Sequence, residues 1–277
     1  MNHIILEDGY ETDYIYSLII GIFYTSTEGI CKLLHSDMKN VNAYYIQEYI
    51  KSKFIYQIHR NMSIGSALVN RFRIFMYNCG WLRSTKQHIL AKAQIDKFYT
   101  FLISETLEYN IRFSKIDLHN NLSVDNKYPM IRITDKMLDP RAKIGCLSSL
   151  TQQWICDHIT ENGKHSYTFS QMPMLVPIYL DTRDPATGLN CKPINIQSRL
   201  RFDSNGDTIQ RMFEWEIHSL VCQTSTGDYY VVLVEYDETF TAYSDKSVPS
   251  NWKIDNSDVA SVRKLMYEAR FVFYRLQ

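Results

Sequence analysis

The sequence lacks cysteine pairs at the spacing of zinc-binding loops. Its six cysteines lie at positions 31, 79, 146, 156, 191 and 222, and none is followed by another cysteine three residues later. Structural zinc sites usually take their thiolates from such pairs, and a chain of this length needs no disulfide framework to be stable. We therefore expect no metal and no cofactor, and we interpret most of the cysteines as small core residues.

The sequence also lacks net charge and long apolar runs. Thirty basic and thirty acidic residues give a formal net charge of zero. A protein that binds nucleic acid concentrates Lys and Arg, so we expect no nucleic-acid partner, and we interpret Arg199, Arg201 and Arg211 as a solvated strand face.

No apolar run is long enough to cross a membrane, and the N-terminus has no signal-peptide pattern. We expect no membrane association and an intracellular location, cytoplasmic or nuclear.

The pattern of apolar residues predicts helices first and strands afterwards. Helical spacing is found over residues 14–24, 44–59, 63–77 and 84–109, the last with Ser84 as its cap. Short β-rich segments follow at 130–134, 153–159, 174–179, 194–202, 209–222, 229–236, 239–243 and 270–274. Asn205-Gly206 is typical of a hairpin turn. We predict one α+β domain over 1–277, with a helical part over 1–125 and an antiparallel β-rich part over 126–277.

A motif near the N-terminus has an aspartate at its centre. Residues 10–23 read YETDYIYSLIIGIF. This resembles the N-terminal box of the ubiquitin-specific proteases, GNTCYMNSLLQxLF, in which the cysteine is the nucleophile. The residues that match the box directly are Thr12, Tyr14, Ser17, Leu18 and Phe23. Asp13 occupies the place of the cysteine, and a carboxylate does not form the thioester intermediate of a cysteine protease.

The C-terminal part of the sequence resembles the other boxes of that family. Gly227, Tyr229 and Tyr230 fit the pattern GHYxxY, and Asp228 takes the place of the general-base histidine. Residues 252–257 resemble WxxFDD and put Asp255 at the third triad position. Asp8 stands where the family has the asparagine that donates to the oxyanion, and a carboxylate repels an oxyanion. Residues 268–275 resemble the terminal strand of the same family.

The resemblance implies a papain-like α+β fold of the ubiquitin-specific protease type, with a thumb-like part before a part like the palm and fingers. It places Asp13, Asp228 and Asp255 in one degenerate triad, with Asp8 at a degenerate oxyanion position. We therefore predict a pseudoenzyme, not an enzyme, that acts as a binding or structural subunit of a larger assembly. Its partners would be proteins, either ubiquitin-like or subunits of that assembly.

Two alternatives stay open at this point. In one, the chain binds ubiquitin or a ubiquitin-like protein. In the other, it is an active hydrolase that uses another nucleophile, such as Cys31 with His35 or Cys222 with His218, or a divalent cation held by the aspartates. The Ile-, Tyr- and Asn-rich composition is typical of AT-rich genomes, including those of large DNA viruses, so association with a virion is a further option.

Overall fold

The computed structural model describes most of the chain. The described residues are 6, 10–25, 34, 41–60, 63–82, 88–90, 94–103, 111–117, 123–161, 165–203, 212–235, 239–244, 252–254 and 258–276. The chain folds as two compact units, Met1–Tyr109 with Ser219–Val262, and Asn110–His218 with Arg263–Gln277. Among the described residues, no helix combines the length and apolar character that crossing a membrane requires.

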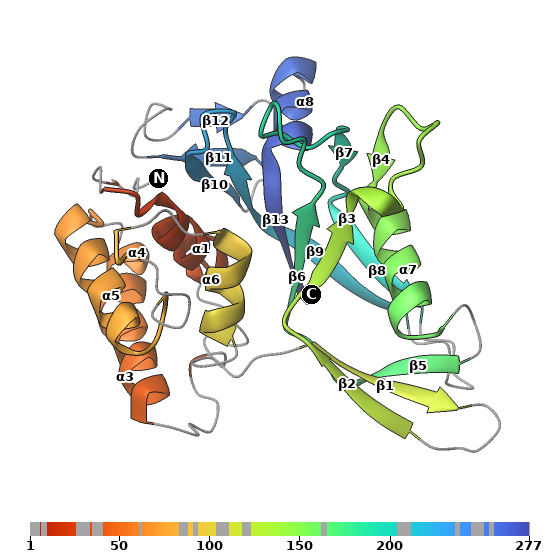
Figure 1. Cartoon of the computed structure of the whole chain (residues 1–277), viewed down its shortest axis with the longest axis horizontal. Helices are drawn as coiled ribbons and strands as arrows, with labels where there is room; N and C mark the ends of the chain where they lie inside the picture. Colours follow the sequence, from red (N-terminus) through yellow and green to blue (C-terminus); the bar gives the residue numbers. More distant parts are fainter. Residues whose placement is uncertain are drawn as a thin grey trace. The chain divides into compact units, whose positions relative to one another are not determined.

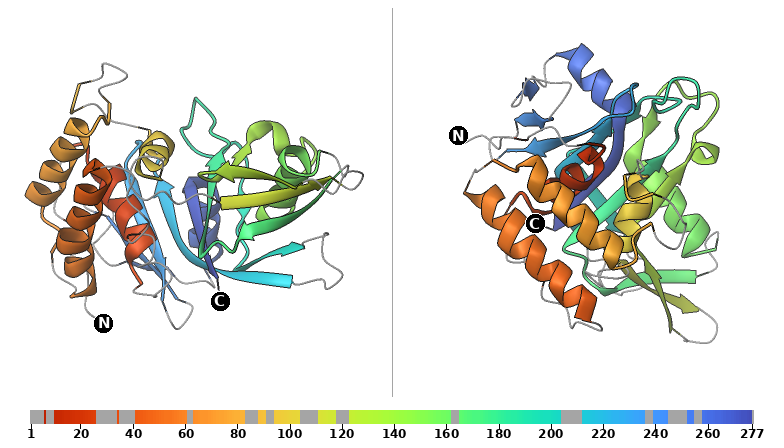
Figure 2. Two further views of the ribbon diagram at one scale, coloured as in Figure 1. Left: turned by 90° about the horizontal axis from the view of Figure 1, so that it is seen from below. Right: turned by 60° about the vertical axis from the view of Figure 1, so that its left-hand side comes forward.

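Helices dominate the first unit (Figure 1). They are α1 (Asp13–Phe23), α3 (Val41–Tyr49), the π-helix η1 (Ile50–Ile55), α4 (Tyr56–His59), α5 (Ser66–Asn78) and α6 (Ile95–Leu102). Every residue of α1 is buried, because apolar side chains cover all of its sides. Figure 2 shows α1 between the helices α3–α5 and the strands of the same unit. The predicted helices over 14–24, 44–59 and 63–77 are thus confirmed.

The first unit also contains four antiparallel strand segments in the order β12-β11-β10-β9. They are β12 (Trp252–Ile254), β11 (Phe240–Tyr243), β10 (Tyr229–Val234) and the second half of β9 (Met212–Gln223). A tight turn joins β9 to β10, and Gly227 supplies its positive φ of 93°. α1 lies close to β9 because Gly21 has no side chain, and the Ser219 hydroxyl donates a hydrogen bond of 2.5 Å to the Gly21 carbonyl.

The second unit is rich in strands. Strands β1 (Ile111–Asp117), β2 (Ser123–Tyr128) and β5 (His165–Gln171) form an antiparallel sheet in the order β2-β1-β5. β6 (Leu175–Asp181) pairs with β13 (Ala269–Leu276) antiparallel and with β3 (Ile131–Thr134) parallel. β8 (Arg199–Asp203) pairs with the first half of β9, and β4 (Gly145–Cys146) pairs with β7 (Ile194–Asn195) in parallel. The 3₁₀ helix η3 (Asp135–Met137) and α7 (Leu147–His158) complete the unit, and α8 (Val259–Glu268) runs from the first unit into it.

The predicted α+β class, helical part first, is confirmed, but several elements differ from the prediction. Residues 153–159 were predicted as a strand, and residues 153–158 belong to α7. That helix buries Leu147, Leu150, Thr151, Trp154 and Ile155, which recur at helical spacing, and a short apolar run at its end does not distinguish strand from helix. The sheets include two parallel pairs beside the antiparallel ones.

Other differences concern element lengths and strands that the sequence did not predict. Within the predicted helix 84–109 the structure has α6 over Ile95–Leu102, residues 88–90 are not helical, and Ser84 lies outside the described residues. The strands β1, β2 and β5 and the helix α8 were not predicted. Residues 205–206 also lie outside the described part, but Asp203 pairs with Met212 antiparallel, as a hairpin requires. The division at residue 125 stays a prediction.

A buried polar network joins a loop of the second unit to its last strand. Arg270, which is 2% exposed, donates one hydrogen bond of 2.6 Å to the Gly188 carbonyl and another to the Asn190 side-chain oxygen. The Asn190 amide donates to the carbonyls of Met266 and Ala269, both at 3.1 Å. The loop that follows β6 is therefore fixed by side-chain hydrogen bonds at the start of β13.

Candidate functional site

Asp13 is fully buried at the N-terminus of α1. One carboxylate oxygen accepts the backbone N–H of Tyr14 at 3.0 Å, and the other accepts the backbone N–H of Tyr229 at 2.6 Å. The structure thus places Asp13, the first predicted triad position, next to the segment that carries Asp228, the second predicted position. A carboxylate is favourable here because the free N–H groups of a helix N-terminus attract negative charge. In this geometry the side chain holds α1 against the start of β10.

Asp228 lies beside this contact but makes different hydrogen bonds. Its carboxylate accepts the hydroxyl of Thr226 at 2.7 Å, and its backbone N–H donates to the Thr224 hydroxyl at 3.1 Å. Asp8 and Asp255 lie outside the described residues, so the convergence of all four aspartates stays a prediction. Within the described part of the chain, no group of three His, Cys, Asp or Glu residues could hold a metal ion.

The segment before α1 is held by a buried cation. Arg73 is 3% exposed, and its guanidinium donates to the Tyr10 carbonyl at 2.7 Å and to the Asn70 side chain at 2.9 Å. Burial lowers the pKa of Arg73 and raises the pKa of Tyr14 to about 12. Glu11 has a φ of 50°, a left-handed conformation that is costly for a residue with a side chain. The backbone that leads to Asp13 is therefore fixed in an unusual conformation.

The structure does not support the Cys222–His218 pair that the sequence offered as a hydrolase alternative. Both side chains are buried in β9, which leaves the thiol out of reach of a substrate. Cys31 and His35 lie outside the described residues.

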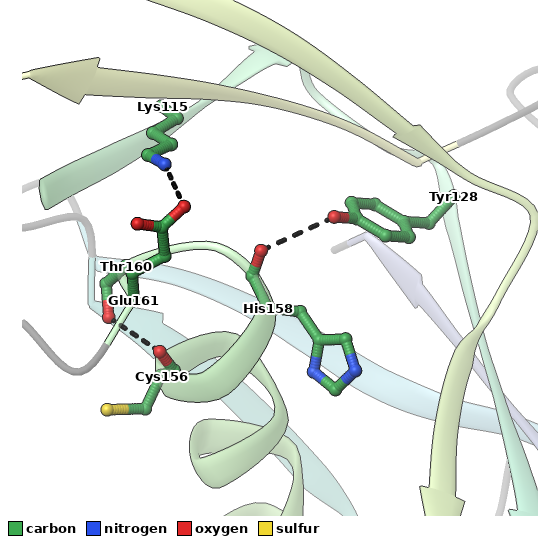
Figure 3. Close-up of polar contacts among 6 residues, drawn as sticks. All are labelled: Lys115, Tyr128, Cys156, His158, Thr160 and Glu161. Carbon is green, nitrogen blue, oxygen red and sulfur yellow. Dashed lines mark hydrogen bonds and ion pairs between the residues drawn. The ribbon is translucent and has the colours of Figure 1, made fainter.

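A second neighbouring pair, Cys156 and His158, is drawn in Figure 3 beside the ion pair of Lys115 with Glu161. The Cys156 thiol and the His158 ring point to different sides of α7. The His158 ring stacks on Trp154 at 4.7 Å, and its Nδ1 lies 3.0 Å from the Trp154 carbonyl. Because a nucleophile and its base must lie within hydrogen-bond reach, this pair does not form a catalytic dyad.

Cys146 has the surroundings of a reactive thiol. It ends β4 directly before α7, so its side chain lies at the N-terminus of a helix. The Gln197 amide donates a hydrogen bond of 3.2 Å to the Cys146 sulfur, and the Ser148 hydroxyl lies 3.3 Å from it. The other atom of the Gln197 amide, Oε1, accepts the backbone N–H of Ser148 at 3.0 Å. One side chain therefore both supports the start of α7 and contacts the thiol.

The protonation of Cys146 follows from these contacts. Burial raises the pKa of the thiol, but hydrogen bonds from the side chains and backbone N–H groups of Ser148 and Ser149 outweigh it and bring the pKa to about 7, from an ordinary value of 9.0. Near neutral pH a large share of this thiol is thiolate, which is the nucleophilic form. The thiol of Cys79 differs, because burial raises its pKa.

A pocket of about 230 Å³ opens beside Cys146. Leu138, Ile144 and Leu150 form much of its apolar wall, and Lys192 forms part of its polar wall. The Lys192 ammonium donates to the carbonyls of residues 139, 140 and 142 at 2.7, 3.0 and 2.9 Å. The loop that rims the pocket is thereby fixed. The space fits a small molecule or a single side chain.

Sequence reasoning interpreted Cys146 as a core residue, and this interpretation is wrong, since the thiol is partly exposed. The nearest sequence signal is Ser148-Ser149, two and three residues after Cys146, because Ser favours helix caps and turns over helix interiors. Gln197 could not have been found, since it lies 51 residues further along the chain.

Comparison with known proteins gives likeness of fold only. No family model matches the chain, and no curated protein matches it. Among solved structures, the SAGA Ubp8/Sgf11/Sus1/Sgf73 DUB module bound to ubiquitin aldehyde has a TM-score of 0.60 and 10% identity, over 100% of this chain and 70% of that chain. A variant of that module has a TM-score of 0.60 and 12% identity, over 98% and 68%. The module bound to monoubiquitin has a TM-score of 0.57 and 10% identity, over 100% and 69%.

These findings confirm the predicted fold of the ubiquitin-specific protease type and correct the prediction that the chain is not an enzyme. That prediction rested on the missing thiol at residue 13. The solved structures that share the fold are deubiquitinase modules, and the chain has a partly exposed thiol, Cys146, with a pKa of about 7 and a contact from Gln197. A carboxylate at one position does not remove thiol chemistry from another, so the prediction is wrong.

Proposed function

We propose that this chain is a ubiquitin-related protein that binds ubiquitin or a ubiquitin-like protein through its protease-type fold. The observation that carries the proposal is the match over the whole chain to Ubp8 modules, two of which are bound to ubiquitin aldehyde and to monoubiquitin. The contact between Asp13 and Tyr229 supports it, because it joins the N-terminal and C-terminal boxes of the resemblance in space. The Ubp8 structures also contain Sgf11, Sus1 and Sgf73, and we extend the proposal to protein partners in an assembly.

The test is a titration of isotope-labelled monoubiquitin with the full chain, followed by NMR. We expect localised shifts on ubiquitin that saturate. Ubiquitin without its C-terminal tail distinguishes binding of the tail from binding of the globular part. A protein of similar size and charge without the ubiquitin fold serves as the control. Absence of shifts at millimolar ubiquitin, or equal shifts with the control protein, would contradict the proposal.

A second candidate function is thiol-dependent acyl transfer at Cys146. The observation that favours it is the combination of a lowered thiol pKa and an adjoining pocket. A thiolate attacks the carbonyl of an ester or thioester, the leaving group departs, and water then releases the acyl group and regenerates the thiol. With a pKa near 7, the thiol needs no separate base to become a thiolate at neutral pH.

The second function is tested with a ubiquitin C-terminal electrophile and, separately, with a small activated ester. Peptide mapping should find the label on Cys146, and Cys146→Ser should abolish both labelling and turnover. Cys191→Ser is the matched control, because Cys191 is an exposed cysteine in the same unit. If the small activated ester labels the thiol and the ubiquitin electrophile does not, the site is restricted to small substrates. Labelling that survives Cys146→Ser would sink the assignment.

A further inference from the structure

The helices α3, η1 and α4 present an exposed row of aromatic side chains. Val41, Tyr44, Tyr45 and Tyr56 are each between 45% and 69% exposed. We call these four residues, with Lys53 and Arg60, the tyrosine face. The buried residues of the same helices, Ala43, Ile46, Ile50, Phe54 and Ile58, recur at helical spacing and lie on the other side. The face extends over roughly 25 Å at the rise of a helix.

The core of the unit does not need the tyrosines of this face. Phe54 and Phe72 lie 5.1 Å apart, and Tyr49 stacks on Phe75 at 5.8 Å, so other aromatic residues fill the space between α3–α4 and α5. Tyr44 and Tyr45 instead contact each other at 5.4 Å, and the Arg60 guanidinium lies 4.6 Å above the Tyr56 ring. Tyr and Arg are the residue types enriched at protein interfaces.

The charges around the face are mainly positive. Residues 41–78 contain five basic residues and one acidic residue, a net charge of +4, although the whole chain has a net charge of zero. The acidic residue, Glu48, is paired with Lys51 at 3.0 Å, and Arg73 is buried. The exposed cations are Lys53 and Arg60 on the face and Arg71 on α5. The Glu48 side chain is 45% exposed, and its charge is offset by its partner Lys51. An approaching partner therefore meets tyrosines and positive charge.

These features decide between possible partners. A second copy of the chain that presented the same face would bring two positive surfaces together, which costs free energy. Nucleic-acid binding relies on many phosphate contacts, and three exposed cations on a neutral chain supply few of them. An acidic peptide with apolar side chains matches both properties of the face, because its carboxylates meet the cations and its apolar residues cover the tyrosine rings.

We propose that the tyrosine face docks an acidic segment of a partner protein that carries apolar side chains at regular spacing. The π-helix η1 lies in the middle of the helices that form the face, and such irregular turns occur frequently at functional sites. This interaction uses α3–α4 and is independent of the binding of ubiquitin and of Cys146.

The probe is a fluorescently labelled peptide of alternating Glu and Leu, titrated with the full chain and followed by anisotropy. We expect saturable binding that weakens as salt is added. The double variant Lys53→Glu with Arg60→Glu should weaken binding roughly tenfold or more, since two attractive contacts become repulsive. Lys136→Glu with Lys143→Glu is the matched control, because both lysines are exposed in the other unit. Tyr45→Ala should also weaken binding, and circular dichroism checks that its fold is intact.

Several results would overturn the proposal. The first is that the acidic peptide does not bind. The second is that a peptide of alternating Lys and Leu binds equally well. The third is that the two double variants weaken binding of the acidic peptide equally. Tighter binding of an oligothymidylate than of the peptide would assign the face to nucleic acid instead. Sedimentation that showed a dimer lost in Tyr45→Ala would assign it to self-association.

Discussion

At the scale of single residues, Asp13 has a structural role. Its carboxylate is buried and accepts two backbone N–H groups from segments that are far apart in the sequence. A cysteine thiol is a weaker hydrogen-bond acceptor than a carboxylate, and the bond to Tyr229 depends on the second oxygen. Residue 13 therefore stabilises the contact between α1 and β10.

This role predicts a loss of stability when one oxygen becomes a nitrogen. In Asp13→Asn the side-chain amide places a donor against one of the two backbone N–H groups and leaves that group without an acceptor. We expect the free energy of unfolding to fall by about 1–3 kcal/mol, measured by urea denaturation. Asp228→Asn is the control, since its partly exposed carboxylate accepts from Thr226, and we expect a change within about 0.5 kcal/mol. Equal effects of the two substitutions would disprove the structural role of Asp13.

Cys146 gives a prediction about pH. Its alkylation by iodoacetamide should follow a titration curve with a midpoint near pH 7, because only the thiolate reacts. A free cysteine thiol in a short unstructured peptide serves as the reference, and its curve should lie higher, at about pH 8.5. Ser148→Ala with Ser149→Ala should move the Cys146 midpoint upwards, because hydrogen bonds that favour the thiolate are lost. A Cys146 midpoint at or above that of the reference peptide would refute the lowered pKa.

The same thiol links pH to stability. Its pKa is lower in the folded state than in the unfolded state, so the unfolded state binds more protons between the two values. The stabilisation is therefore fully present above the unfolded pKa and is lost as the pH falls through about 7. In Cys146→Ser, the free energy of unfolding should therefore vary less with pH between the folded and the unfolded pKa of the thiol.

At the scale of secondary-structure elements, the packing of α1 depends on a glycine. A side-chain carbon at Gly21 would lie 3.3 Å from both the Ser219 hydroxyl and a Val221 methyl, which is tighter than most packed contacts. Gly21→Val should force α1 away from β9 and lower the free energy of unfolding by about 1–3 kcal/mol in thermal denaturation. Ala67→Val on the exposed side of α5 is the matched control and should change stability by less than about 1 kcal/mol. An unchanged melting temperature for Gly21→Val would show that the close approach is absent.

The loop at Asn190 gives a second prediction at this scale. Asn190→Ala removes the acceptor of the buried Arg270 and the donor to two carbonyls. We expect the free energy of unfolding to fall by about 2–3 kcal/mol, because buried polar groups are left without partners. Thr187→Ala is a control in the same loop, since its hydroxyl is exposed and bonds to Asp184 at 3.2 Å. If Thr187→Ala lowers the free energy of unfolding as much as Asn190→Ala does, the network does not stabilise the loop.

The elements also show what local sequence can reveal. The all-apolar run of α1 is long enough to be identified as a buried helix, and the structure agrees. The run around Trp154 is short, and only its packing beneath the β2-β1-β5 sheet, where Trp154 contacts Phe113 and Tyr128, distinguishes helix from strand. In β1, Lys115 lies on the same side of the strand as the buried Ile111 and Phe113, which interrupts the apolar alternation that predicts a strand.

At the scale of the whole molecule, charge is balanced overall but unevenly distributed along the chain. The net charge is zero and the isoelectric point is about 7.1, whereas residues 41–78 carry +4. Molecules without net charge repel one another least, so association is easiest near that pH.

Solubility should therefore be lowest near about pH 7 and rise at about pH 5.5 and pH 9, as measured by precipitation with ammonium sulfate. Lys53→Glu with Arg60→Glu makes the chain more acidic and should move the minimum to lower pH. A minimum that stays in place would show that apolar contacts, rather than net charge, control solubility.

The sequence by itself determined the fold class, the buried central helix and the pairing of the two boxes. Apolar periodicity is a local property that the sequence shows directly. The resemblance of the two boxes to the ubiquitin-specific proteases implied that Asp13 lies near residues 227–229, and the Tyr229 N–H donates to Asp13. Only the tertiary structure decided which thiol is reactive and where the tyrosines lie. The pKa of Cys146 depends on where its helix begins, its contact with Gln197 joins residues distant in the sequence, and the exposure of Tyr45 and Tyr56 depends on which side of their helices packs inwards. Electrostatic environment and burial are set by neighbours in space, and the order of residues along the chain does not specify these.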